Sequence, residues 1–179
     1  MQQDLQEILF SEAALNERVS ELGAQITKDY EGKALTVVGI LKGSNIFTSD
    51  LVRKINLPLK MDFMAVSSYG NATESTGVVQ ILKDLDKSIE GEHLLIVEDI
   101  VDSGLTLKYL KEILIARQPA SIKICTLLDK PARRKENITP DYTGFEVPDE
   151  FIVGYGIDYA ERYRNLPVVG ILKREVYEK

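Results

Sequence analysis

The chain has 179 residues, of which 44% are hydrophobic, and carries a formal net charge of −6. This length supports one sizeable core, so we expect a single domain over residues 1–179. The acidic balance disfavours broad electrostatic binding to nucleic acid or to an anionic membrane, although a local basic site stays possible. No apolar run approaches the roughly 20 residues that span a bilayer, and MQQDLQEILF lacks the order of a signal peptide. We therefore expect a cytoplasmic protein.

The chain contains one cysteine, Cys125, and one histidine, His93. A single cysteine excludes an internal disulfide, and its place in the apolar run IKICTLL favours a buried thiol. His93 precedes the apolar run LLIV, where a structural role is expected. With one cysteine and one histidine, the chain has few candidate residues for a zinc site or for a Ser-His-Asp triad.

The first predicted element is an amphipathic helix over about 11–31. Its apolar residues recur at helical spacing, at Leu15, Val19, Leu22 and Ile26. Ser11 and Glu12 precede this pattern and Gly32 follows it, as expected of the start and the stop of a helix.

Short runs rich in Val, Ile and Leu follow and predict strands. They span 34–41, 59–66, 78–82, 94–97, 122–128, 151–153 and 168–172. Helical segments near 45–55 and 104–116 give a strand-helix-strand alternation, and runs such as LLIV are typical of a parallel sheet covered on both faces. We expect an open, doubly wound α/β fold with a mainly parallel twisted sheet. Ligands of such sheets bind beyond the carboxyl ends of the strands.

Two segments, 67–77 and 130–150, are expected to lack regular structure. Loops this long in a compact domain tend to be functional or disordered. The first, SSYGNATESTG, has the composition of a mobile flap.

The stretch LLIVEDIVDSGLTL at 94–107 runs from a predicted strand into three carboxylates, Glu98, Asp99 and Asp102. Any one acid could simply stabilise the first turn of the next helix, with Ser103 as its N-cap. Three acids in five positions repel one another unless cations or hydroxyl donors are nearby. The stretch therefore favours a ligand that supplies such groups.

The segment Ser103-Gly104-Leu105-Thr106 can expose backbone N–H groups at a helix N-terminus, which is a seat for phosphate. A ligand with both hydroxyls and a phosphate would use the acids and the amides together, and ribose 5-phosphate is such a ligand. The chain has no GxxxxGK[ST] sequence, which excludes a P-loop NTPase. A receiver-type phosphoacceptor would also keep acids at strand ends, but it would not explain the phosphate loop.

The segment VEDIVDSGLT resembles the 5-phosphoribosyl-1-pyrophosphate (PRPP) signature of type I phosphoribosyltransferases. Further landmarks resemble the hypoxanthine-guanine branch of that family: GILKGSNIF at 39–47, SSYG at 67–70, LLDK at 127–130, FIVGYGIDY at 151–159 and Arg164. The resemblance implies that family's fold, with a small hood region and a flexible flap. It also implies an enzyme that transfers the 5-phosphoribosyl group of PRPP to N9 of hypoxanthine or guanine.

The resemblance also implies roles for residues on the PRPP side. Asp102 is the candidate general acid or base. The ribose and its 5-phosphate are assigned to Glu98, Asp99, Asp102, Ser103, Gly104, Leu105 and Thr106. The pyrophosphate is assigned to Leu41, Lys42, Gly43 and Arg164, in a loop whose Leu-Lys bond is often cis in the family. Leu105 departs from the pattern, because several relatives carry lysine there.

On the purine side, the resemblance assigns the base to Lys130, Phe151, Ile152, Ile157 and Asp158. Mg²⁺ is the implied cofactor, with Glu98, Asp99 and Asp158 as its ligands. The flap would close through Ser68 and Tyr69. Taken alone, Lys130 could equally be an exposed loop cation and Phe151 an ordinary core aromatic.

The expected partners are the small molecules PRPP, hypoxanthine and guanine, and a homodimer or homotetramer is expected. The competing hypothesis is a regulator that keeps the fold and the PRPP loop without catalysis. A regulator would need a basic RNA-binding face or a fused DNA-binding domain. The basic cluster at 133–135 sits beside five acids between 136 and 150. The enzyme is therefore favoured, without a role for nucleic acid or membrane.

Overall fold

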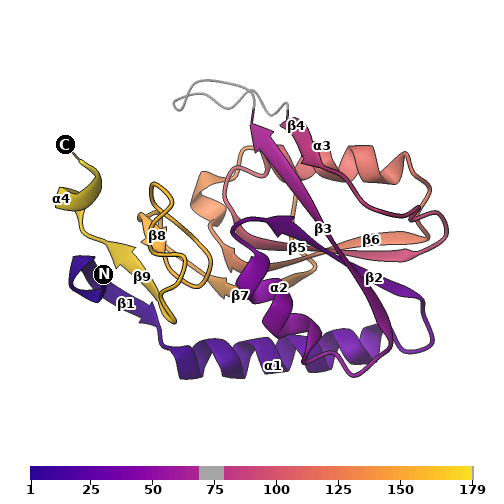
Figure 1. Ribbon diagram of the computed structural model, residues 1–179, viewed down its shortest axis with the longest axis horizontal. Helices are drawn as coiled ribbons and strands as arrows, with labels where there is room; N and C mark the ends of the chain where they lie inside the picture. Colours follow the sequence, from indigo (N-terminus) through magenta and orange to yellow (C-terminus); the bar gives the residue numbers. More distant parts are fainter. Residues whose placement is uncertain (69–78, 179) are drawn as a thin grey trace.

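The computed structural model describes residues 1–68 and 79–178, with Ser68 described by its backbone alone (Figure 1). The predicted flap residue Tyr69 and the side chain of Ser68 lie outside this description. No helix in the described part of the chain is both long and apolar enough to cross a membrane.

A six-stranded sheet forms the centre of the molecule, in the order β4-β3-β2-β5-β6-β7. β4 pairs antiparallel with β3, and the other neighbours are parallel. Its strands are β2 (Leu35–Leu41), β3 (Leu59–Ser68), β4 (Val79–Lys83), β5 (His93–Val101), β6 (Ser121–Asp129) and β7 (Tyr142–Glu146). The expected mainly parallel α/β sheet is confirmed.

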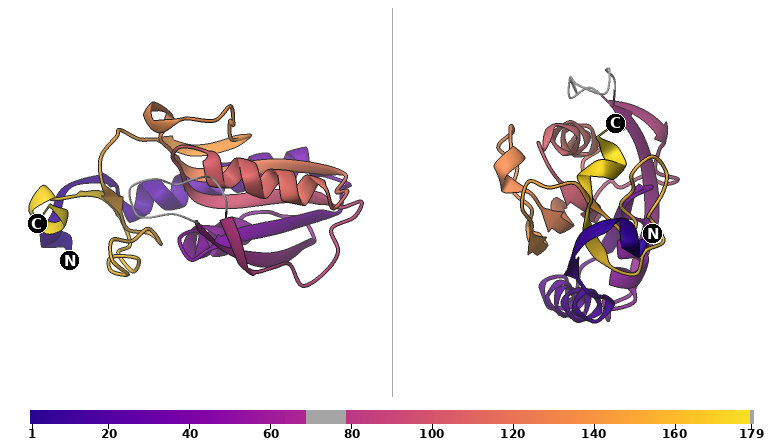
Figure 2. Two further views of the ribbon diagram at one scale, coloured as in Figure 1. Left: turned by 90° about the horizontal axis from the view of Figure 1, so that it is seen from above. Right: turned by 90° about the vertical axis from the view of Figure 1, so that its left-hand side faces the viewer.

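Helices cover both faces of this sheet (Figures 1 and 2). α1 (Glu12–Asp29) and α2 (Asn45–Val52) pack on one face, and α3 (Leu105–Ile115) packs on the other. The predicted start of α1 is confirmed, because Ser11 Oγ accepts from the N–H of Ala14 at 3.2 Å.

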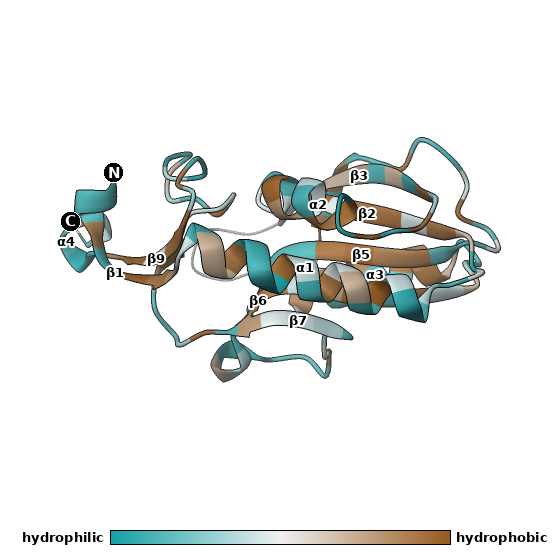
Figure 3. Ribbon diagram, turned by 90° about the horizontal axis from the view of Figure 1, so that it is seen from below, coloured by the Kyte–Doolittle hydropathy of each residue, from teal (hydrophilic) through white to brown (hydrophobic). Residues whose placement is uncertain are grey.

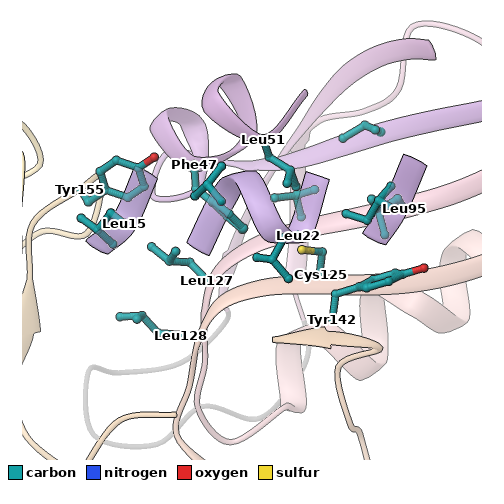
Figure 4. Packing of buried hydrophobic residues seen from close by; sticks show 14 of the residues in the cluster. Leu15, Leu22, Phe47, Leu51, Leu95, Cys125, Leu127, Leu128, Tyr142 and Tyr155 are labelled. Carbon is teal, nitrogen blue, oxygen red and sulfur yellow. The ribbon is translucent and has the colours of Figure 1, made fainter. Parts of the chain in front are cut away.

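The core lies in two layers that match these faces. Side chains of α1 and α2, such as Leu22 and Phe47, meet Leu95 and Leu127 of the sheet, and buried Cys125 lies in the same layer (Figure 4). The hydropathy of β2 and β5 reflects their central position, since both are largely hydrophobic (Figure 3). Burial raises the pKa of the Cys125 thiol, in agreement with an inert buried cysteine.

A second, three-stranded antiparallel sheet forms the hood at the end of the molecule where both termini lie (Figure 2). It contains β1 (Leu5–Phe10), β9 (Val169–Leu172) and β8 (Ile152–Val153), flanked by a short 3-10 helix, η1 (Gln2–Asp4), and by α4 (Arg174–Tyr177). The sequence did not predict β1 or α4.

Three local expectations are wrong. The segment 130–150 is not without regular structure, because it contains η2 (Pro131–Arg133) and β7. β5 does not end with the apolar run but continues through the acids to Val101. The N-cap of α3 is Gly104, not Ser103: Gly104 has a φ of 81°, and Ser103 Oγ instead accepts from the N–H of Leu105 at 3.3 Å.

Candidate active site

The consecutive acids Glu98 and Asp99, near the end of β5, have different neighbours. Glu98 borders a 110 Å³ pocket with the residues that lead into α3. Asp99 instead faces the turn after β2, where a Cβ at Gly43 would collide with its Oδ2 atom. The glycine therefore lets the backbone of the turn approach the carboxylate.

Both acids are hard to ionise in this setting. Burial raises the pKa of Glu98 well above its ordinary value, and the charge of Asp99 raises it further. Burial also raises the pKa of Asp99 to about 6, even though hydrogen bonds from backbone N–H groups and the charge of Arg164 lower it. Such carboxylates are stabilised by a cation. Within residues 1–68 and 79–178, no three acidic, histidine or cysteine side chains group closely enough to enclose a metal. Carboxylate oxygens of this kind suit Mg²⁺, which is commonly shared between protein carboxylates, waters and substrate oxygens.

The 110 Å³ pocket lies where β5 leads into the N-terminus of α3, the place at which the sequence predicts the phosphate. Ser103, Gly104 and Thr106 line it together with Glu98 and Asp102, whereas Leu105 does not. Gly104 is required here, because its φ is positive and a Cβ would lie 2.5 Å from Ile138 Cγ2. The glycine thus lets the loop turn sharply into α3.

Lys130 is buried and meets Asp102. Its side chain is 7% exposed, and its ammonium donates to the carbonyl of Glu150 at 2.9 Å and lies 3.6 Å from Asp102 Oδ1. That Oδ1 atom has no hydrogen-bond partner in the described structure. Lys130 is therefore not an exposed loop cation, and it leaves donor capacity directed toward the space beside Asp102.

A 450 Å³ pocket adjoins this pair and brings the predicted purine residues together. Lys130, Phe151, Ile152, Ile157 and Asp158 all line it. Phe151 is 38% exposed, so it is not an ordinary core aromatic. A larger cavity of 780 Å³ lies beside α1 and α2, but none of the predicted site residues lines it.

Several residues that line the 450 Å³ pocket were not identified from the sequence. They are Ile100, Arg133, Asp149, Glu150, Arg174, Tyr177 and Glu178. Tyr177 stacks on Phe151 with ring centroids 4.7 Å apart. Ile100 lay within the predicted motif and could have been found, but no sequence signal indicates that α4 would fold back onto the pocket.

The turn after β2 packs against the loop that carries Arg164. The Leu41–Lys42 peptide bond is cis, and a Cβ at Gly156 would collide with the carbonyl of Gly43. Lys42 Nζ lies 3.0 Å from Glu161 Oε2.

Arg164 is fixed within its own loop. Its guanidinium donates to the carbonyl of Gly156 at 2.9 Å and pairs with Asp158 at 3.0 Å. The Arg164 Nε atom is buried and has no partner among the described residues. The guanidinium of Arg164 thus lies between Asp158 and Glu161, 3.0 and 3.3 Å away, and beside the turn after β2.

Comparisons with known proteins agree with this geometry. The sequence model of the phosphoribosyl transferase domain matches residues 6–160. The hypoxanthine-guanine phosphoribosyltransferase of Bacillus subtilis (strain 168) is 56% identical over 178 residues, which are 99% of each protein. The bifunctional protein TilS/HprT of Listeria monocytogenes (strain F2365) is 54% identical over 179 residues, but this chain spans only 28% of that protein.

A comparison with solved structures also finds similarity to a phosphoribosyltransferase. The hypoxanthine phosphoribosyltransferase from Staphylococcus aureus superposes with a TM-score of 0.98 at 56% identity, over 100% of this chain and 97% of that one. The extent of these matches shows that the chain belongs to the phosphoribosyl transferase domain family.

Proposed function

We propose that this chain transfers the 5-phosphoribosyl group from PRPP to N9 of hypoxanthine or guanine, forming IMP or GMP and releasing pyrophosphate. One observation carries the proposal: Asp102 lines both the 110 Å³ anion pocket and the 450 Å³ pocket. A 5-phosphate in the first pocket and a base in the second would meet at this carboxylate. The high identity to named enzymes over the whole chain supports the same reaction.

The base is held by Lys130 and Phe151 in this proposal. The Lys130 ammonium has three donors, one of which is used by Glu150, and can donate to O6 and N7 of a 6-oxopurine. Phe151 offers its exposed ring for stacking, and Ile157 adds apolar contact. Main-chain groups of Ile152 contact the edge of the base. As N9 bonds to C1 of the ribose and the bond from C1 to pyrophosphate breaks, Asp102 accepts the proton that the purine loses, and in the reverse direction it returns that proton.

PRPP is held by groups on the other side of Asp102. The amides of the loop with Ser103 and Thr106 bind the 5-phosphate, and Glu98 and Asp99 accept from the ribose hydroxyls. The turn Leu41-Lys42-Gly43 and Arg164 bind the pyrophosphate. Leu105 belongs to the same loop but does not line the pocket, and its N–H donates to Ser103 Oγ at 3.3 Å.

Mg²⁺ is the proposed cofactor, held by Glu98, Asp99 and Asp158 together with substrate oxygens. When bound, it would neutralise charge on the departing pyrophosphate. The raised pKa values of Glu98 and Asp99 support a cation at this place. As pyrophosphate leaves, positive charge develops on the ribose ring, and the surrounding carboxylates stabilise it.

We further propose that residues 1–179 act as one domain, in a cytoplasmic homodimer or homotetramer. Light scattering coupled to size exclusion would measure the oligomeric state. The competing regulator has no support in the comparisons, since the relatives named above are enzymes.

The proposal is tested by incubating the protein with PRPP, Mg²⁺ and one purine at a time. Pyrophosphate release is expected with hypoxanthine and guanine and not with adenine. Omission of the base is the control for simple hydrolysis of PRPP. Absence of turnover with every base, in a protein that still binds PRPP, would favour the regulator.

A further inference from the structure

The loop Asp102–Gly104 is anchored through its carbonyl groups from one side. Arg134 Nη1 donates to the carbonyl of Asp102 at 3.0 Å. The next carbonyl, that of Ser103, accepts from the N–H groups of Lys135 at 2.9 Å and Glu136 at 3.2 Å. All three donors belong to the segment 134–136, which follows η2.

This anchoring dictates where the amides of the loop point. In a trans peptide unit, the C=O of one residue and the N–H of the next point in opposite directions. The carbonyls of Asp102 and Ser103 face the segment 134–136, so the N–H groups of Ser103 and Gly104 face away from it. Neither N–H has a backbone partner in the part of the chain that the structure describes. Both are therefore available to an anion in the 110 Å³ pocket that these residues line.

Arg134 is itself firmly held. Its guanidinium pairs with the carboxylate of Asp129, the last residue of β6, and both side chains are only 17% exposed. Asp129 lies opposite Val101 in the register of β5 and β6. Arg134 thus ties the end of one strand to the loop that leaves its neighbour, through the planar fork that a guanidinium provides.

Arg134 lines neither of the two pockets, whereas its neighbour Arg133 lines the larger one. A direct contact with substrate is therefore not its role. Its contacts are all with protein groups that shape the site.

We infer that Arg134 is a positioning residue for this reaction. Its guanidinium fixes the peptide unit after Asp102, so that the N–H of Ser103 faces the anion pocket and the Asp102 carboxylate faces the base. The backbone N–H groups of Lys135 and Glu136 hold the next peptide unit, which carries the N–H of Gly104. The inference rests on the proposed function, because the anion in question is the 5-phosphate of PRPP.

The test uses Arg134→Met, which keeps the stem of the side chain and removes its donors, and Arg134→Lys. Arg117→Met is the matched control, because Arg117 follows the far end of α3 and makes two hydrogen bonds to Asp84, at 2.7 and 2.8 Å. Calorimetry gives Kd for PRPP with Mg²⁺, kinetics give kcat and KM for each substrate, and thermal melting gives Tm.

Arg134→Met is expected to weaken PRPP binding about tenfold or more, in line with the loss of a charge-assisted hydrogen bond. kcat should also fall, while KM for hypoxanthine changes less than KM for PRPP. Arg134→Lys should lie between Met and wild type, since one ammonium cannot reproduce the planar fork. Arg117→Met should bind PRPP as the wild type does, even if its Tm falls.

Unchanged PRPP binding by folded Arg134→Met would overturn the inference and leave the proposed function intact. If that variant does not fold, Arg134→Lys decides, and wild-type PRPP affinity in it would also overturn the inference. Equal losses for PRPP and hypoxanthine would show a general structural role instead. A wild-type protein that does not bind PRPP would overturn the proposed function and this inference with it.

Discussion

The ammonium of Lys130 lies 3.6 Å from Oδ1 of Asp102, and the two residues approach each other from the ends of neighbouring strands. Lys130 follows β6 and Asp102 follows β5. Lys130 and Asp102 therefore share one wall of the base pocket. The lysine can donate hydrogen bonds to a purine, and the carboxylate can exchange a proton with the same purine. This pairing places recognition of the base beside the proposed proton transfer.

Asp102→Asn is expected to keep the fold and PRPP binding while kcat falls by about 10²–10⁴-fold, the range typical of a lost general acid or base. The amide keeps the shape of the side chain but cannot take the proton. Steady-state kinetics and PRPP calorimetry check this. Asp86→Asn, at an exposed residue away from both pockets, is the control. Near wild-type turnover by Asp102→Asn would leave Asp102 without a catalytic role.

Lys130→Met should erase the preference for 6-oxopurines over adenine. Adenine presents an amino donor toward the ammonium of the wild type, which leaves a buried charge facing another donor. The mismatch supports a discrimination of about 10²-fold or more. The measurement is kcat/KM for hypoxanthine, guanine and adenine in both proteins. Lys108→Met, which removes an exposed lysine, should keep the wild-type ratio. An unchanged ratio in Lys130→Met would remove this lysine from the specificity role.

Phe151→Leu should raise KM for hypoxanthine several-fold and leave KM for PRPP nearly unchanged. The substitution keeps an apolar side chain but loses aromatic stacking, which contributes about 0.5–1.5 kcal/mol beyond burial. Phe145→Leu is the matched control, because Phe145 stacks on Phe10, at 3.9 Å between centroids, and does not line the base pocket. Equal rises in KM for both substrates of Phe151→Leu would speak against stacking on the base.

Asp99→Asn should stabilise the substrate-free protein at neutral pH. The pKa of Asp99 in the folded protein is raised to about 6, above its value in the unfolded chain, so the folded state holds the proton more tightly. Its contribution to stability is therefore largest at low pH and is lost as pH rises through about 4 to 6.

The Asn variant lacks this loss, so the Tm of the variant minus that of wild type should increase between pH 4 and pH 7. PRPP affinity in the presence of Mg²⁺ should fall in the same variant. Asp86→Asn should show neither trend. A Tm difference that stays constant or shrinks over this pH range would contradict the raised pKa.

Much of this protein can be predicted from local sequence patterns. The apolar spacing of α1 and the Val- and Ile-rich strands each encode their structure within a few turns or strand lengths. The stretch VEDIVDSGLT indicates a strand that leads into a helix, but not where β5 ends or which residue caps α3. The strand end, the loop and the helix start follow one another in the sequence from Glu98 to Thr106. The residues of the anion loop can therefore be recognised from the sequence. The resemblance to a family then supplied the residues of the base pocket.

Other features depend on contacts between distant segments. β1 exists because Leu5 pairs opposite Leu172, and its sequence LQEILF has no strong strand pattern of its own. The contact of Tyr177 with Phe151 joins α4 to the residue before β8, so it depends on the pairing of β8 and β9 in the hood sheet. The burial of Lys130 and the hold of Arg134 on the carbonyl of Asp102 likewise require β5 and β6 to be adjacent. Local propensity cannot encode such pairs, because their energy appears only when chain closure brings both partners together.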